Sequence, residues 1–174
     1  NSPIGVGRGI FPGRVAWVRD PAAVPWDGTT GCWWEETNAI RQARVDAMLS
    51  RGIKSLTGSA TDSNAWDNVF RYFNSTHGRG NVGYATTETI VVKINLNNCS
   101  SHSDNDNNAD ASKQSVLALL RQLVNQAGIP QSMITVCDAS RSIPSRIYDP
   151  CHAEFTNVVW VDWSGLDGRT SNNW

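Results

Sequence analysis

Two apolar segments of strand length flank one amphipathic helix in the middle of the chain, and this unit constrains the fold more than any other feature. TIVVKINL occupies residues 89–96 and MITVCDA residues 133–139, and both are nearly continuous runs of strand-forming residues. Between them, residues 112–127 carry apolar side chains at spacings of three and four, which predicts a helix. This order predicts a right-handed crossover between parallel strands, and continuous apolar strands are typical of a sheet covered on both faces.

Further periodic segments extend this unit on both sides. GRVAWV at 13–18 and NVVWVDW at 157–163 are predicted strands. Helices are predicted over 38–56, closed by Gly58, and again after Asp62. The sequence therefore predicts an α/β fold, a three-layer sandwich with a mostly parallel sheet of about four strands and a loop-rich N-terminal segment.

The bulk properties indicate one domain over residues 1–174, long enough to bury a core. A net charge of −1 gives no electrostatic footprint for nucleic acid, and no apolar run approaches the length of about 20 residues that crosses a membrane. We therefore expect no nucleic-acid partner and no membrane insertion. Within the domain, residues 1–12 are predicted to form an extended arm and residues 98–111 a polar loop rich in Asp and Asn.

The four cysteines bear on cofactors and compartment. None forms a C-x-x-C pair, so an iron–sulfur cluster or a covalent haem is poorly supported. An even count in a secreted chain suggests two disulfides, and we expect Cys99 with Cys151 and Cys32 with Cys137. The alternative is four reduced, mostly buried thiols.

Other features of the sequence also fit a secreted, periplasmic or cell-surface protein. Two N-x-S/T triplets make Asn74 and Asn98 candidate glycosylation sites. The chain begins at Asn1 rather than Met, which fits a processed or trimmed chain.

The glycines of GVGRGIFPG precede a predicted strand rather than opening a helix, so a dinucleotide-binding loop is not expected there.

A ligand site is expected beyond the carboxyl ends of the parallel strands. Asp138, Ser140 and Arg141 place a carboxylate, a hydroxyl and a guanidinium on one turn, which could hold an anionic ligand. The alternative is an Asp–Arg pair that only secures the loop. The full set of candidate ligand-binding residues is Lys93, Asn95, Asp138, Ser140, Arg141 and Asp162.

The polar loop has two interpretations. Its alternating oxygen-bearing residues resemble the start of a calcium loop, so Asp104, Asp106, Asn108 and Asp110 are candidate calcium ligands. A strict EF-hand is excluded, because it needs Gly and Glu where this chain has Ala109 and Ser115. In the other interpretation, Asp110 or Ser112 caps the following helix and the rest is solvated.

Several segments together resemble the secreted branch of domain-of-unknown-function family 362. They are, in order, GVGRGIFPGRVAWV, GCWWEE, AWDNVFRYFN with HGRGNVGY, IVVKINLN, NNADASKQSVLALLRQLVNQAGIP and ITVCDASR. The resemblance covers residues 4–169 and implies a domain that continues beyond the equivalent of GLDGR, so this chain would be an incomplete family domain. The clustered cysteines of the iron–sulfur members are absent, and the family implies no established activity.

Three classes of function follow, in order of preference. The first is a structural or interaction protein of the cell exterior, a subunit of an assembly or filament that self-associates or binds another surface protein. The second is a small-molecule or calcium-binding domain, and the third is an enzyme of unknown reaction. Candidate interface residues are Ile10, Phe11, Trp33, Trp34 and Trp174, whereas Trp17, Trp66 and Trp160 are predicted to lie in the core.

Overall fold

The computed structural model describes residues 5–35, 40–97, 102, 107–108 and 110–172. Its helices are α1 (Gln42–Thr57), α2 (Asp62–Thr76), α3 (Lys113–Arg121) and α4 (Ser145–Glu154), and α3 continues as a π-helical stretch, Gln122–Gln126. The strands are β1 (Ile90–Lys93), β2 (Ile134–Cys137), β3 (Val159–Asp162) and β4 (Thr170–Ser171). The α/β class and the parallel sheet are therefore confirmed.

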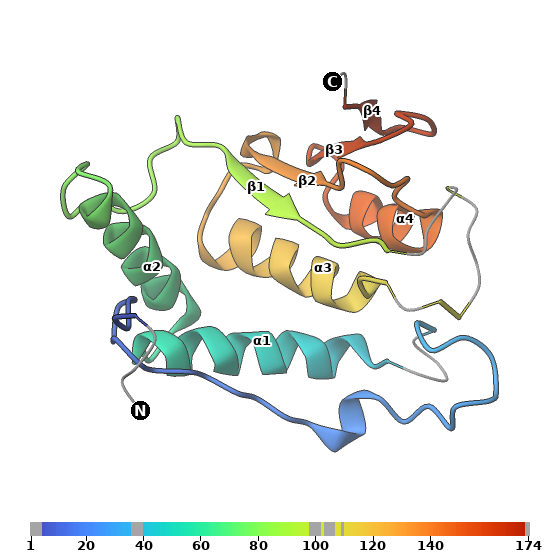
Figure 1. The fold of residues 1–174 in the computed structure, drawn as a ribbon, viewed down its shortest axis with the longest axis horizontal. Coiled ribbons are helices and arrows are strands. Elements are labelled where there is room, and N and C mark those ends of the chain that lie inside the picture. The colour runs from blue at the N-terminus through green and yellow to red at the C-terminus, as the bar shows by residue number, and fades with distance from the viewer. Residues whose placement is uncertain (1–4, 36–39, 98–101, 103–106, 109, 173–174) are drawn as a thin grey trace.

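The sheet has the order β1-β2-β3-β4, and every neighbouring pair is parallel. Figure 1 shows α3 and α4 on one side of this sheet and α1 beneath α3, with α2 beside α1. Val92, Val136 and Trp160 lie in register across three strands on the side that faces the helices, and all three are buried. The core thus sits between the sheet and the α3–α4 layer.

The opposite face of the sheet differs from what the sequence predicts. We expected helices on both faces, but within the described ranges no helix covers the second face. Val91 and Val159, which alternate with the buried residues, are 63% and 39% exposed. The three layers are therefore the sheet, α3 with α4, and α1, and the sheet lies on the outside.

Residues 13–18 correct a second expectation, because they form no strand. The segment is extended, and its alternation is that of a strand: Ala16 and Val18 turn towards α1, whereas Val15 and Trp17 are 86% and 84% exposed. Trp17 is therefore not a core residue. Trp160 is buried as predicted, and Trp66 is half-buried against the core.

The helix ends follow local chemistry. Gly58 adopts a φ of 67° and closes α1, as its position predicts. Thr61 caps α2 by accepting a hydrogen bond from the Asn64 backbone. Ser112, rather than Asp110, caps α3 through the Ser115 N–H at 3.2 Å. The helix α4 and the short strand β4 were not predicted from the sequence. None of the helices that the structure describes has the length and apolar character needed to cross a membrane.

Candidate functional site at the strand ends

The same three-residue pattern, Asp-x-Ser, ends both β2 and β3. Asp138 and Asp162 are the aspartates, and both are buried, with 2% and 0% exposure. The Oδ1 atom of Asp138 accepts the Ser140 N–H at 2.9 Å, and that of Asp162 accepts the Ser164 N–H at 3.0 Å. Each strand therefore ends in a tight Asx turn made by its own carboxylate.

The second oxygen of each aspartate reaches the loop that follows the preceding strand. Asp138 Oδ2 accepts the Leu96 N–H at 2.9 Å, and Asp162 Oδ2 accepts the Ile143 N–H at 2.8 Å. Asp162 Oδ1 also accepts the Gly165 N–H at 2.7 Å. Both carboxylates thus hold neighbouring strand-end loops together. The Asp-x-Ser repeat could have indicated the two turns from the sequence, but not these bonds to the neighbouring loops.

A basic side chain lies beside each of the two aspartates. Lys93 Nζ lies 3.5 Å from Asp138 Oδ2 and also contacts the Ile94 carbonyl oxygen. Burial acts to raise the pKa of Asp138, but the hydrogen bonds from Ser140 and Leu96 and the charge of Lys93 outweigh it and lower the pKa. Asp138 is therefore ionised in the folded protein, and its contacts stabilise the fold.

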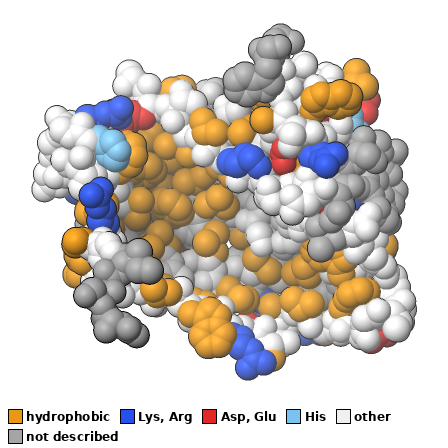
Figure 2. All heavy atoms as spheres, viewed as in Figure 1, with side chains coloured by type: hydrophobic (Ala, Val, Ile, Leu, Met, Phe, Trp, Pro, Cys, Tyr) orange, Lys and Arg blue, Asp and Glu red, His pale blue; other side chains and the backbone are white. Residues whose placement is uncertain are grey.

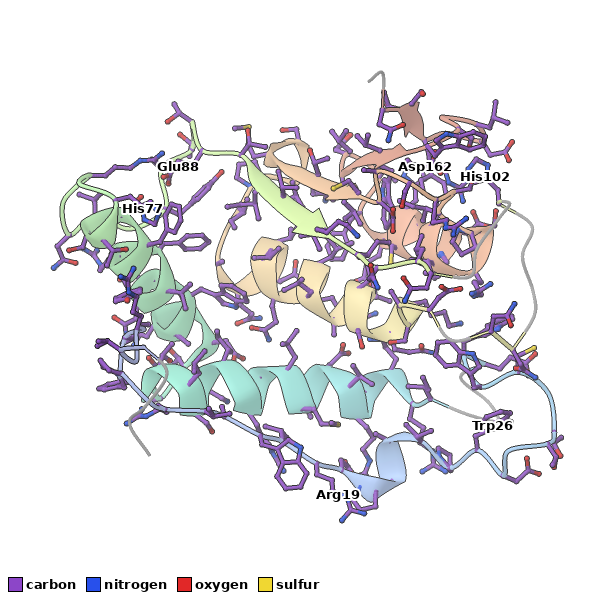
Figure 3. The ribbon with its side chains drawn as sticks, in the orientation of Figure 1. Arg19, Trp26, His77, Glu88, His102 and Asp162 are labelled. Carbon is purple, nitrogen blue, oxygen red and sulfur yellow. The ribbon has the colours of Figure 1, made fainter. Side chains whose placement is uncertain are left out.

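Asp162 has His102 as its neighbour, and Figure 3 labels both. The imidazole Nε2 lies 2.7 Å from Asp162 Oδ2 and 3.0 Å from Ser164 Oγ, and Nδ1 lies 3.0 Å from Asp167 Oδ2. Burial acts to raise the pKa of Asp162, but the Gly165 and Ile143 N–H groups and His102 lower it. His102 is not among the candidate residues predicted from the sequence, because its partners Asp162 and Asp167 lie about 60 residues further along the chain.

The contacts of His102 resemble a Ser–His–Asp arrangement, but its second carboxylate argues against that chemistry. A general base needs a lone pair on the nitrogen that faces the serine. The 2.7 Å contact to Asp162 assigns the Nε2 proton to that carboxylate, so the nitrogen has no lone pair for Ser164. The cluster is therefore a buried polar network that ties His102 to the end of β3 and to the turn that follows it.

The other predicted ligand residues do not converge. Asn95 donates from Nδ2 to Asn97 Oδ1 at 3.1 Å. Arg141 is exposed, and its backbone carbonyl oxygen accepts the Trp163 N–H. Asp138 thus pairs with Lys93 rather than with Arg141, which corrects the expected Asp–Arg pair.

The calcium prediction is tested only in part. Asp104 and Asp106 lie outside the described residues. The backbone carbonyl oxygen of Asn108 accepts the Trp33 indole N–H, and Asp110 forms an ion pair with Arg146 at 3.2 Å with both side chains buried. Within the described part of the chain, no group of three or more His, Cys, Asp or Glu residues is arranged to hold a metal.

The predicted disulfides are wrong where they can be checked. Cys137 and Cys151 are free thiols, so neither expected pair forms, and Cys99 lies outside the described residues. Burial raises the pKa of the Cys151 thiol to about 12.

The glycosylation prediction at Asn74 also fails. Asn74 is 2% exposed and its amide donates to the Val82 and Gly83 carbonyls, which makes it unsuitable for glycosylation. Asn98 lies outside the described residues.

The candidate interface residues are mostly engaged within the chain. Trp33 donates to Asn108 as described, and the Arg146 guanidinium lies 5.6 Å from the ring centre of Trp34. Phe11 is 42% exposed and packs under the Arg14 guanidinium, and Ile10 is half-buried. Trp174 lies outside the described residues.

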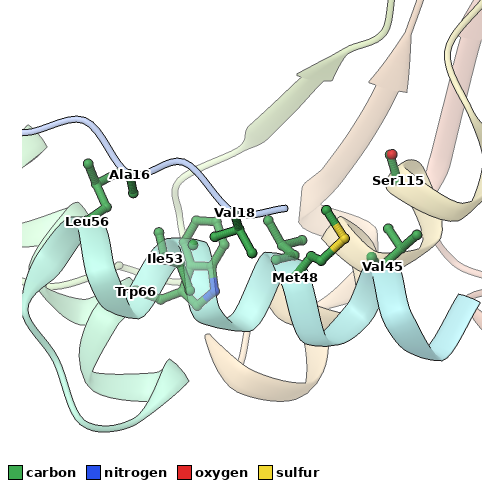
Figure 4. Close-up of a pocket in the computed structure, with 11 residues that line it drawn as sticks. Ala16, Val18, Val45, Met48, Ile53, Leu56, Trp66 and Ser115 are labelled. Carbon is green, nitrogen blue, oxygen red and sulfur yellow. The ribbon is translucent and has the colours of Figure 1, made fainter. Parts of the chain in front are cut away.

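Two apolar hollows lie away from the strand ends. A cavity of about 410 Å³ lies between segment 13–18 and α1, lined by residues such as Val18, Met48 and Ile53 (Figure 4). A larger groove of about 720 Å³ runs between α2 and the outer edge of β1. Figure 2 shows hydrophobic side chains gathered in a hollow in this region. We call it the β1 groove; its apolar lining is Val69, Phe70, Phe73, Ile90 and Val91. Arg79 and Glu88 also line it and form an ion pair with each other at 2.8 Å.

The chain matches no protein-family model, and neither a curated protein nor a solved structure is detectably similar to it. The resemblance to domain-of-unknown-function family 362 therefore stays a prediction, and any function has to be argued from the surfaces described above.

Proposed function

We propose that this protein is an interaction module that binds an extended polypeptide by adding it as a strand to the edge of β1. The observation that carries the proposal is the exposed, apolar state of that edge. Within the described residues β1 pairs only with β2, and Val91 on β1 is 63% exposed beside the β1 groove. Strand addition takes its affinity from main-chain hydrogen bonds and its specificity from pockets that receive alternate side chains.

Within β1 itself, Lys93 is the one charged residue, and the Arg79 and Glu88 charges in the groove are paired with each other. Exposed edge strands are usually shielded by charged side chains or by a covering loop. The one lysine of β1, Lys93, has its ammonium group turned to Asp138 and to the Ile94 carbonyl oxygen, towards the strand ends. The apolar stretch Ile90–Val92 therefore lacks a charge of its own to repel an incoming strand.

The strand-end cluster supports the alternatives less well. A ligand-binding or catalytic site needs polar groups that are available to a ligand, whereas both strand-end aspartates accept several backbone N–H groups. The free thiols of Cys137 and Cys151 also remove one argument for secretion, so a location outside the cell rests on the sequence alone.

The test is a selection of displayed random peptides against the whole chain, followed by hydrogen exchange of the complex. We expect enriched peptides with alternating apolar residues that slow amide exchange at Val91 and Lys93. Val91→Lys should abolish their binding, because it places a charge in the groove. Val24→Ser, at a position 53% exposed on a distant loop, is the matched control and should bind as the parent does. Peptides that protect other segments, or that bind both variants equally, would contradict the proposal.

A further inference from the structure

Residues 13–18 have the properties of a strand without a partner. The segment runs as an extended chain along α1 in Figure 1, and Val15 and Trp17 are 86% and 84% exposed. Over the described residues, no backbone–backbone hydrogen bond ties residues 15–18 to any other part of the chain. Val and Trp favour strands, so this sequence has a strand's preferences and lacks only the neighbour that would satisfy them.

The edge of β1 offers what that segment lacks. The Ile94 N–H bonds to the Cys137 carbonyl of β2, and the parallel register alternates along the strand. The backbone groups of Val91 and Lys93 therefore point away from β2, towards the open edge. Beside this edge lies the β1 groove, with Phe73 46% exposed in its wall.

A chain cannot bring its own segment to its own edge. Ala16 and Val18 rest on the apolar side of α1, and α1 packs against α3, which lies under the sheet (Figure 1). The segment and the β1 edge are thus separated by two helices. Two different surfaces that meet between copies make a head-to-tail contact, which generates rings or filaments.

We propose that residues 13–18 of one copy add as a strand to β1 of a second copy, with Val15 and Trp17 in the β1 groove. This inference rests on the proposed function and names its partner. Ala16 and Val18 keep their contacts with α1, because alternate side chains of one strand point to opposite sides. The segment then joins two copies, with one face on each.

The test measures mass in solution by light scattering as concentration rises, with one donor variant and one acceptor variant. Trp17→Ser removes the inserted side chain, and Val91→Lys closes the groove. Both positions are exposed, so both variants should keep the parent circular dichroism spectrum and melting temperature. We expect the parent to form species larger than dimers, and each variant to associate at least about tenfold more weakly.

Mixing the two variants gives the sharpest result. Trp17→Ser keeps an intact β1 edge and Val91→Lys keeps an intact segment, so together they can make one junction. We expect the mixture to form dimers and nothing larger. Val6→Ser, at an arm position 88% exposed, should assemble like the parent.

Three results would overturn this inference: a parent that stays monomeric, a mixture that stays monomeric, or an equal loss in Val6→Ser. If the parent is monomeric but selected peptides still protect β1, the interaction module stands and the second copy is not its partner. If neither self-association nor peptide binding occurs, both proposals fall.

Discussion

Replacing Asp162 by Ala should destabilise the fold strongly without touching the proposed interface. The carboxylate accepts backbone N–H groups from Ile143, Ser164 and Gly165 at 2.7 to 3.0 Å and lies 2.7 Å from His102 Nε2. Hydrogen bonds to a charged group each contribute about 1.5–3 kcal/mol, and Asp162→Ala leaves three backbone N–H donors without this acceptor. We expect a loss of about 3–5 kcal/mol, a large part of the about 5–15 kcal/mol that stabilises a domain.

The assay is urea unfolding monitored by circular dichroism. The matched control replaces a second carboxylate that contacts the same histidine. Asp167 lies 3.0 Å from His102 Nδ1, but its side chain is 70% exposed. Water screens such a pair, and Asn tolerates the left-handed backbone of this position (φ 52°), so Asp167→Asn should lose less than about 1 kcal/mol. If Asp162→Ala loses no more free energy of unfolding than Asp167→Asn, the assigned role of the buried carboxylate is wrong.

The contribution of Asp162 to stability should depend on pH in the acidic range. The pKa of Asp162 is lowered in the folded state, so the unfolded chain takes up a proton first as the pH falls below about 4. The stability that Asp162 provides is therefore complete above pH 4 and is lost on further acidification. In Asp162→Asn this contribution is missing, and we expect the difference in unfolding free energy between parent and variant to shrink below pH 4.

Three other predictions follow from single positions. Gly165→Ala should cost more than about 3 kcal/mol in thermal unfolding, because φ is 65° and a Cβ there would lie 2.3 Å from the backbone nitrogen of Ser171 in β4. The control Gly28→Ala, at a φ of 86° with open space around the Cβ, should cost about 1 kcal/mol. Ser112→Ala removes the cap of α3 and should cost about 1 kcal/mol by the same assay. Alkylation without reductant should label half-buried Cys137 well before buried Cys151, as mass spectrometry of peptides would show; protection of Cys137 would mean that it is oxidised.

Periodicity predicted the elements whose apolar pattern is local. The helices α1 and α2 and the β1–α3–β2 unit were found from spacing alone, and Gly58 ends α1 where a left-handed residue is needed. The helix α4 was missed because Pro144 and Pro150 suggest a loop. Pro144 instead precedes the first helical residue, and Pro150 lies within the helix.

The errors came from features that only tertiary contacts decide. Segment 13–18 has the composition of a strand, but composition cannot say whether a neighbour is present to pair with it. Continuous apolar strands suggested a sheet covered on both faces, whereas Val91 shows that one face is open. The strand-end aspartates were located correctly, but their bonds to Leu96 and Ile143 join residues far apart in the sequence.

The strand order has a consequence for what such a sheet can recognise. In open α/β sheets, a crevice for small molecules forms where the strand order reverses and successive helices part to opposite faces. Here the order runs β1-β2-β3-β4 without reversal, and α3 and α4 stay on one side. Adjacent strand-end loops therefore lie close together, and each carboxylate reaches the loop that follows the preceding strand. Within the described sheet, this strand order therefore leaves no crevice of that kind. The surfaces that remain accessible to other molecules are the face of the sheet that no helix covers and the outer edge of β1.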